Sequence, residues 1–247
     1  MNINGNTVLI TGGGTGIGFA LAAEFASRGN RVLICGRREE RLKAAGEKIP
    51  GLFTGRCDVS DPRGRKDLLE WIRSEHPELN VLVNNAGIQR PVDLAAGTDD
   101  IEKGEDEIDI NFRSQVFLTA LFIPFLKEKE KAAIINITSG LGFIPLARYP
   151  LYSASKAAFH SYTLSLRHQL RDTTIKVFEA IPPTVFDTEL KGFRMDRNDW
   201  SISSAEMASA IMDGLIKDRD EITAGTSGYW VSCTEKERDR IFHEINR

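Results

Sequence analysis

The stretch TGGGTGIG at residues 11–18 directly follows the apolar run VLI at residues 8–10. The apolar run predicts a buried strand, and the glycines after it predict a tight turn into a helix. The free N–H groups and the positive dipole end of such a helix suit a pyrophosphate. Gly12, Gly16 and Gly18 give the spacing GxxxGxG, and no frame here gives GxGxxG. We interpret the stretch as a dinucleotide-binding turn, although an ordinary strand-to-helix loop can also be rich in glycine.

Composition narrows the class of protein. Of the 247 residues, 41% are hydrophobic, and a single α/β domain over residues 1–247 is the simplest interpretation. The formal net charge of −3 and the absence of a basic cluster argue against a nucleic-acid partner. Cys35, Cys57 and Cys233 lack metal-ligand spacing, so we expect reduced thiols and no metal site. The longest apolar run, residues 116–126, is too short for a transmembrane segment, so we expect a soluble, cytoplasmic protein.

Short β-branched runs alternate with longer helical patterns, which is typical of βαβ units and a parallel sheet. We expect strands at residues 7–10, 31–35, 51–57, 81–83, 133–138, 176–181 and 221–224. In an open parallel sheet the ligand crevice lies at the C-terminal ends of the strands. The polar residues that follow each strand are therefore the candidates for a binding site.

Two basic residues, Arg37 and Arg38, follow the second strand. An NAD site would place an acidic side chain here for the ribose hydroxyls, whereas guanidinium groups suit the 2′-phosphate of NADP(H). NADP(H) is therefore favoured over NAD. The alternative is that both arginines only begin a solvated helix.

Further candidates follow the third and fourth strands. Asp58, with Val59 after it, can accept from an adenine amino group or can serve only as a turn residue. Asn85, Ala86 and Gly87 can hold neighbouring strands together and leave room for a flat cofactor, or can form an Asn-rich turn.

The stretch at residues 98–109 is acidic, and we interpret it as the solvated start of a long helix, where the dipole favours carboxylates. Metal binding by this run is disfavoured because no histidine accompanies it. Asn111 lies between Ile110 and Phe112. An amide in an apolar helical stretch needs a hydrogen-bond partner unless it faces solvent.

Tyr152 and Lys156 occur in the run YSASK, 13 residues after Ser139. Positions i and i+4 share one face of a helix, so the phenol and the ammonium project the same way. Lowering a tyrosine pKa by roughly three units requires about 4 kcal/mol, which Lys156 and a cationic nicotinamide can supply. We expect Ser139 to hydrogen-bond the substrate oxygen. A YxxxK pair also occurs on exposed helices, so the prediction depends on all three residues occurring behind a dinucleotide turn.

In this order, TGGGTGIG, NNAG, Asn111, Ser139 and YSASK resemble the motifs of the short-chain dehydrogenase/reductase family over nearly the whole chain. The resemblance implies a three-layer αβα Rossmann-type fold, doubly wound, with seven parallel strands in the order 3-2-1-4-5-6-7. It also implies a catalytic tetrad of Asn111, Ser139, Tyr152 and Lys156. In that tetrad Lys156 holds the nicotinamide ribose, and Asn111 supports a water-mediated proton relay.

The cofactor-binding residues that we predict are Gly12, Gly14, Thr15, Gly16, Ile17, Gly18, Arg37, Arg38, Asp58, Val59, Asn85, Ala86, Gly87, Tyr152, Lys156, Pro182 and Thr188. Two features depart from the family pattern. Pro183 replaces the glycine of Pro-Gly and cannot donate a backbone hydrogen bond, and Phe186 lengthens the path to Thr188, the residue expected at the carboxamide. Thr15 stands where many NADP-using members have a basic residue, so Arg37 has to do more of the phosphate recognition.

Within the family, the runs ICGRREERL and NVLVNNAGIQ are similar to the subgroup encoded in D-alanyl lipoteichoic acid operons. Residues 185–204 are irregular in pattern. We expect them to form a substrate lid over a partly apolar pocket that includes Leu141, Phe143 and Leu146, or else a structural loop that covers the sheet.

These features predict an NADP(H)-dependent oxidoreductase that transfers a hydride between the cofactor and a small carbonyl or secondary alcohol. The alternative is a non-catalytic NADP(H)-binding sensor or scaffold. The helices expected near residues 106–128 and 151–170 are apolar on more than one side. Because the equivalent helices of the family pair across a subunit interface, the resemblance implies a homodimer or homotetramer.

Overall fold

The computed structural model describes residues 1–188, 190 and 200–247. Seven parallel strands form one sheet in the order β3-β2-β1-β4-β5-β6-β9, which confirms the predicted fold class. The strands are β1 (Thr7–Thr11), β2 (Arg31–Gly36), β3 (Phe53–Arg56), β4 (Val81–Asn84), β5 (Ala132–Ile137), β6 (Ile175–Ile181) and β9 (Glu221–Thr223). The numbering reaches β9 because two short strands, β7 (Thr184–Val185) and β8 (Ser201–Ile202), pair with each other outside this sheet.

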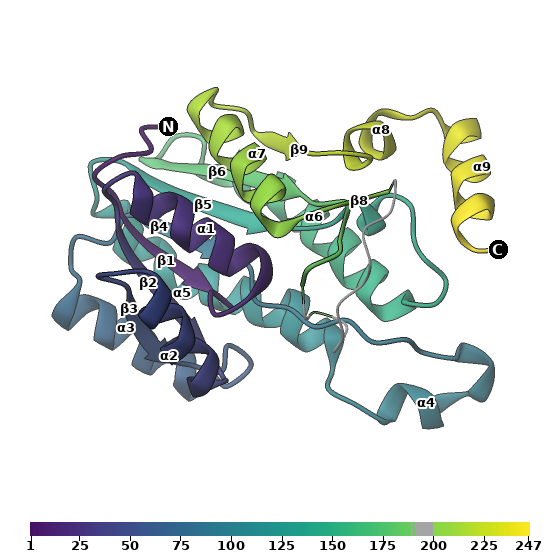
Figure 1. Ribbon diagram of the computed structural model, residues 1–247, viewed down its shortest axis with the longest axis horizontal. Helices are drawn as coiled ribbons and strands as arrows, with labels where there is room; N and C mark the ends of the chain where they lie inside the picture. The colour runs from purple at the N-terminus through teal and green to yellow at the C-terminus, as the bar shows by residue number, and fades with distance from the viewer. Residues whose placement is uncertain (189, 191–199) are drawn as a thin grey trace.

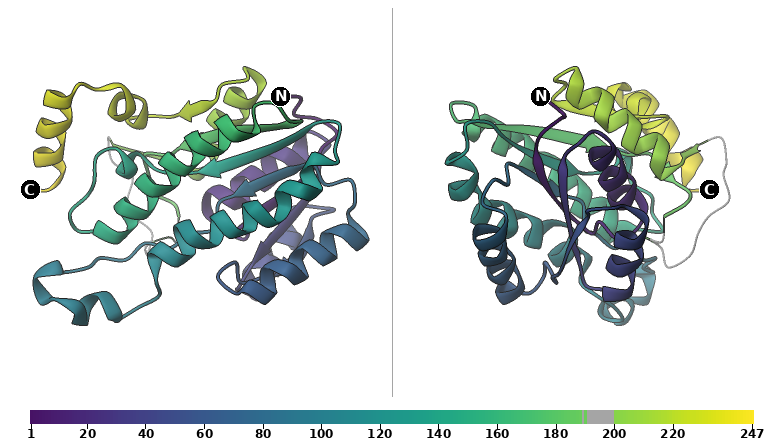
Figure 2. Two further views of the ribbon diagram at one scale, coloured as in Figure 1. Left: turned by 180° about the vertical axis from the view of Figure 1, so that it is seen from behind. Right: turned by 60° about the vertical axis from the view of Figure 1, so that its left-hand side comes forward.

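Helices cover both faces of the sheet (Figure 1). One layer contains α1 (Gly16–Ser27), α2 (Glu39–Lys48) and α7 (Ser204–Ile216). The other contains α3 (Pro62–Glu75), α5 (Ser114–Lys127) and α6 (Pro150–Leu170). These helices lie in front of the sheet in the view from behind (Figure 2). A large cluster of buried apolar side chains fills the space on each face. Among the described residues, no helix combines the length and apolar character needed to cross a membrane.

Three further helices of the described chain extend past the C-terminal edge of the sheet (Figure 1). They are α4 (Thr98–Glu102), which follows the turn η1 (Leu94–Ala96), and the pair α8 (Ser227–Ser232) and α9 (Glu235–Ile245). The last of these begins with a capping box, in which Thr234 and Glu237 satisfy each other's backbone N–H groups. Its Ile241 is buried in an apolar cluster with Ile144 and Trp230, so α9 packs on the body of the chain.

The acidic residues from 98 to 106 do not belong to the long helix, so that part of the prediction was wrong, whereas helix is continuous from Glu107 to the end of α5, close to the helix expected near residues 106–128. The first helix, α4, ends at Glu102, and the chain becomes helical again at Glu107, which leads through the π-helical turn η2 (Asp109–Arg113) into α5. At the start of this second stretch Glu107 is fully buried rather than solvated, and its Oε1 accepts a hydrogen bond from the backbone N–H of Arg90 at 3.2 Å. The guanidinium of Arg90 donates to the carbonyls of Asp100 and Ile101. This buried charge folds the acidic segment back onto the chain that follows β4.

A buried amide network joins the middle of the sheet to the helices behind it. Asn136 on β5 is fully buried, and its Nδ2 donates to Thr163 Oγ1 on α6 at 2.9 Å. Its Oδ1 accepts from Asn84 Nδ2 at 2.8 Å, and Asn84 Nδ2 also donates to Thr119 Oγ1 on α5 at 2.8 Å. The network therefore connects β4, β5, α5 and α6 directly below the C-terminal edge of the sheet.

Asn136→Ala should lower the free energy of unfolding by about 1–3 kcal/mol, because Asn84 and Thr163 each lose a buried partner. Urea denaturation at neutral pH measures this change. Asn2→Ala is the control, since Asn2 is exposed, and it should change stability by less than about 0.5 kcal/mol. Equal stabilities for the two variants would contradict the prediction.

Candidate active site

A cavity of about 440 Å³ opens at the C-terminal edge of the sheet. It runs from the glycine turn and the start of α2 to the start of α6 and the chain after β6. All of the predicted site residues line it except Gly18 and Asn111. The residues that do so are Gly12, Gly14, Thr15, Gly16, Ile17, Arg37, Arg38, Asp58, Val59, Asn85, Ala86, Gly87, Ser139, Tyr152, Lys156, Pro182 and Thr188.

The glycine turn has the backbone geometry that its sequence predicts. Gly12 and Gly16 have positive φ angles of 64° and 56°. A Cβ on Gly18 would lie 2.5 Å from Asn85 Nδ2 and 2.6 Å from the Gly12 carbonyl oxygen. Gly18 therefore lets α1 pack against the turn and does not line the cavity. The bare turn and the N-terminus of α1 fit the pyrophosphate of a dinucleotide.

The end of the cavity near α2 carries positive charge. Arg37 directly follows β2, and both of its terminal nitrogens contact the carboxylate of Glu105. Arg41, which sequence reasoning missed, also lines this end, and a Cβ on Gly14 would lie 3.2 Å from its Cβ. Its position in the basic run RREER at residues 37–41, just after β2, is the signal that could have found it. These cations fit an adenosine phosphate.

Asp58 forms a turn and lines the cavity at the same time. Its Oδ1 accepts from Ser60 N at 2.9 Å and from Ser60 Oγ at 2.7 Å. Asn85 joins the ends of two strands, because its Nδ2 donates to the Thr11 carbonyl oxygen at 2.8 Å. Asp58 therefore forms a turn and also faces the cavity, and Asn85 holds two strands together and also lines the cavity.

Tyr152 and Lys156 lie one turn apart on α6, and both are buried. Lys156 Nζ donates to the Ile137 carbonyl oxygen at the end of β5 at 2.9 Å and lies 5.7 Å from the centre of the Tyr152 ring. Ser139 follows two residues after β5, and its Oγ accepts from Leu141 N at 3.1 Å in the turn η3 (Gly140–Gly142). The three predicted side chains therefore converge at one end of the cavity.

Burial sets the protonation of this cluster. It raises the pKa of Tyr152 to about 12, with the Ser139 hydroxyl acting in the opposite direction and the charge of Glu107 adding to the rise. Burial also lowers the pKa of Lys156 to about 8. We expected Lys156 to lower the pKa of the phenol, but in the chain by itself desolvation outweighs every favourable neighbour.

Asn111 lies behind the cavity wall. A Cβ on Gly87 would lie 3.1 Å from its Oδ1. Asn111 Nδ2 donates to the Ile88 carbonyl oxygen at 2.8 Å and to Ser155 Oγ at 3.2 Å, and Oδ1 accepts from Ile88 N at 2.8 Å. The predicted need of this amide for partners is confirmed. Its place on a π-helical turn is typical of functional sites.

Sequence reasoning missed a carboxylate–imidazole pair behind Ser139 and Lys156. Glu179 on β6 is fully buried, accepts from Thr138 Oγ1 at 2.7 Å, and contacts His160 Nδ1 at 3.0 Å through both oxygens. His160 lies one helical turn after Lys156, and Thr138 directly precedes Ser139. The pair therefore fastens α6 to the end of β5. A glutamate within the apolar run of β6 was the available signal.

The wall near Ser139 is mostly apolar. It contains Leu141, Leu146 and Trp230, together with the amide of Gln89. Phe143 was expected here but instead packs on His160, with ring centres 4.5 Å apart. Trp230 packs over Gly140, where a Cβ would lie 2.8 Å from the indole ring.

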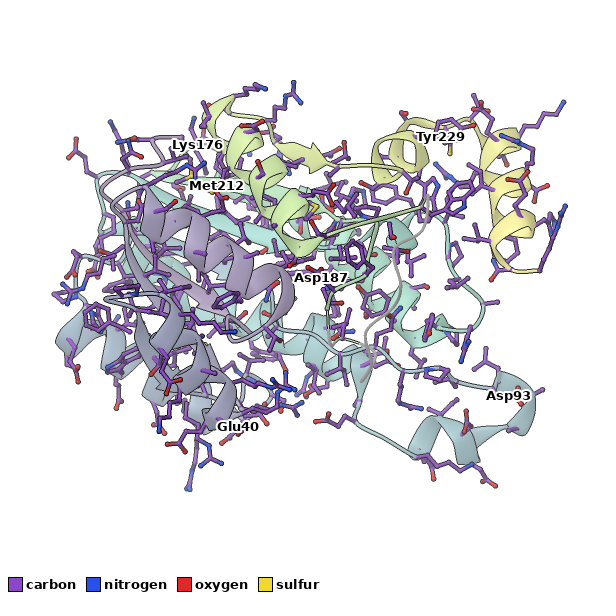
Figure 3. The ribbon with its side chains drawn as sticks, in the orientation of Figure 1. Glu40, Asp93, Lys176, Asp187, Met212 and Tyr229 are labelled. Carbon is purple, nitrogen blue, oxygen red and sulfur yellow. The ribbon has the colours of Figure 1, made fainter. Side chains whose placement is uncertain are left out.

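The predicted lid is described only in part. Val185, Thr188 and Leu190 line the cavity. Asp187 lies near α7 (Figure 3). Its carboxylate accepts hydrogen bonds from the backbone N–H and the hydroxyl of Ser204 in the first turn of α7. Residues 189 and 191–199 lie outside the described part of the chain.

Residues 6–199 match the family model for short chain dehydrogenases, and the chain belongs to this family. It is an NAD(P)-dependent short-chain dehydrogenase/reductase, an oxidoreductase that uses a nicotinamide cofactor and a small-molecule substrate. It is 47% identical over 249 residues to the uncharacterized oxidoreductase DltE of Bacillus subtilis (strain 168), covering 100% of this chain and 98% of that protein. This match confirms the predicted subgroup resemblance.

A second relative is the NADP-dependent 3-hydroxy acid dehydrogenase YdfG of Salmonella typhi, 31% identical over 193 residues, which cover 78% of this chain and 77% of that protein. Two solved structures share the fold. A short chain dehydrogenase from Burkholderia cenocepacia in complex with NADP has a TM-score of 0.83 at 24% identity, with 99% of each chain covered. One from Burkholderia phymatum in complex with NAD has a TM-score of 0.83 at 20% identity, covering 100% of this chain and 97% of that one.

The pair of His160 and Glu179 should make stability depend on pH. Glu179 raises the pKa of His160, with a smaller contribution from Glu221, while burial and Arg167 oppose the rise. Because the folded pKa lies above the unfolded one, the stabilisation is complete below about pH 6.5 and is lost as the pH rises through the folded value.

Urea denaturation of wild type and His160→Gln at several pH values measures this effect. The difference in unfolding free energy should be largest below pH 6.5, the ordinary value for the group, and should shrink above it. His243→Gln is the control, because that side chain is 70% exposed. A difference that grows with pH would contradict the assignment.

Proposed function

We propose that this chain is an NADP(H)-dependent oxidoreductase that reduces a small carbonyl compound or oxidises the matching secondary alcohol. The convergence of Ser139, Tyr152 and Lys156 at one end of a cavity supports this proposal, together with the cations at the other end. The bound nicotinamide supplies or accepts the hydride. The resident side chains position the substrate oxygen and move its proton.

In the reducing direction Tyr152 donates its phenolic proton to the substrate oxygen, and Ser139 orients that oxygen. A pKa raised to about 12 keeps the phenol protonated at neutral pH. Lys156 holds the nicotinamide ribose and passes a proton toward Tyr152. Asn111 holds the Ile88 backbone through one hydrogen bond to its carbonyl and one from its N–H, and thereby supports a water-mediated relay.

The substrate end is partly apolar, with the neutral amide of Gln89 among its described lining residues. Small ketones and aldehydes fit such a wall. Because one relative is named a 3-hydroxy acid dehydrogenase, 3-hydroxy and 3-keto acids belong in the substrate screen. We propose that residues 185–204 form the lid over this end.

We further propose that residues 1–247 form one domain, that the protein is cytoplasmic, and that it assembles as a homodimer or homotetramer. Phe117 on α5 and Leu164 on α6 are 50% and 42% exposed. Apolar side chains exposed on two neighbouring helices favour a partner surface.

Tyr152→Phe should lower kcat for carbonyl reduction by at least about 100-fold, because the proton donor is lost. Cofactor titration of the same variant should show NADPH affinity close to wild type, which separates loss of chemistry from loss of binding. Tyr162→Phe is the matched control, since Tyr162 is on the same helix but does not line the cavity. Retention of more than a few per cent of turnover by Tyr152→Phe would rule out the proton-transfer role.

NADPH should bind at least about tenfold more tightly than NADH, a difference of about 1.4 kcal/mol. Arg37→Gln should remove most of that difference, because the charge-assisted fork to the 2′-phosphate is lost. Fluorescence titration of each cofactor gives the dissociation constants, with Arg113→Gln as the control on an exposed arginine. Equal or tighter binding of NADH by wild type would overturn the NADP assignment.

A further inference from the structure

We infer that Glu105 is a cofactor-selectivity residue, whose carboxylate competes with the 2′-phosphate of NADP(H) for Arg37. The inference rests on the proposed NADP preference and extends it to a residue from a distant part of the chain. Glu105 lies 68 positions after Arg37, in the loop between α4 and η2.

The contact uses the groups that a phosphate would use. Arg37 Nη2 donates to Glu105 Oε2 at 3.1 Å, and Nη1 donates to Oε1. Such a two-point fork is the geometry in which arginine binds either carboxylate or phosphate. A phosphate that binds the same two N–H groups of the guanidinium must therefore displace Glu105. Arg37 lines the cavity, so the competition takes place at the cofactor site itself.

The ion pair is accessible from solvent. The side chains of Arg37 and Glu105 are 41% and 51% exposed, and an exposed pair of this kind contributes only about 0.2–1 kcal/mol. A dianionic phosphate can exchange with a single carboxylate at such a site. Glu105 therefore weakens NADP(H) binding without preventing it.

The loop that carries Glu105 has a separate anchor. Arg90 binds the carbonyls of Asp100 and Ile101, and Glu107 accepts from the Arg90 backbone. Gly104 packs directly on Arg90, where a Cβ would lie 2.8 Å from Nε. This anchor holds Glu105 within reach of Arg37 and keeps the loop folded when the carboxylate is displaced.

The two cofactors differ at this contact. NAD(H) carries a hydroxyl where NADP(H) carries the phosphate, so its binding leaves the pair of Arg37 and Glu105 intact. NADP(H) has to break the pair. Glu105 therefore acts on NADP(H) alone and narrows the selectivity that Arg37 provides.

Isothermal titration of the full chain with 2′,5′-ADP and 5′-AMP tests this inference without turnover. Glu105→Gln should tighten 2′,5′-ADP by roughly two- to fivefold, the range expected for an exposed ion pair, and should leave 5′-AMP unchanged. Glu102→Gln, which removes an exposed carboxylate from the neighbouring helix, should affect neither ligand. In an Arg37→Gln background, Glu105→Gln should have no effect on either ligand.

The possible failures are distinguishable. If wild type prefers 2′,5′-ADP but Glu105→Gln does not tighten it, the competition is overturned and the role of Arg37 stands. Equal tightening of both ligands would show a general charge effect and would also overturn the competition. If wild type shows no preference for 2′,5′-ADP, the proposed NADP selectivity fails together with the inference.

Discussion

The close approach of β1 and β4 at their C-terminal ends is the constraint on which the site depends. Thr11 Oγ1 accepts from the backbone N–H groups of Asn85 and Ala86, each at 3.0 Å. A Cβ on Gly12 would lie 3.0 Å from the Ala86 Cα. The strand order reverses at β1, so the connections of β1 and β4 leave toward opposite faces and open a crevice between them. Polar side chains and a bare glycine hold that crevice in shape.

Burial then decides which group at the catalytic end carries charge. A free phenol and a free ammonium have similar pKa values, 10.0 and 10.5, but here they stand at about 12 and about 8. The ammonium of Lys156 therefore gives up its proton well before the phenol of Tyr152 does. Under our proposal this order suits reduction, because Tyr152 stays in its donor form and Lys156 is the group that exchanges protons with the relay. Oxidation requires the positive charge of the bound nicotinamide to lower the phenol pKa again.

The fold was predictable because its signals are local. Apolar β-branched runs marked the central strands of the sheet, whereas the edge strands β3 (FTGR) and β9 (EIT) contain few such residues. The spacing of Tyr152 and Lys156 placed both on one helical face. Contacts between distant segments were not predictable in this way. Glu107 was assigned to a solvated run on composition alone, yet one backbone N–H and the nearby Arg90 allow it to be buried. The pair of Arg37 and Glu105 depends on the path of the loop after α4, which hydrophobic periodicity in the sequence does not predict.

Buried contacts next to the loop that carries Glu105 limit how far a movement at one end of the cavity can reach the other end. Glu107 and Asn111 are four residues apart and bind the backbone of Arg90 and Ile88, which are two residues apart. Four helical residues rise about 6 Å, and two residues of any chain span at most about 7 Å, so the two contacts fix the start of η2 against the segment after β4. When a phosphate displaces Glu105, the buried contact of Glu107 lies between the displaced residue and Asn111 along the chain, and it holds Asn111 in place. Cofactor choice at Arg37 and the chemistry at Tyr152 can thus vary independently on the same fold.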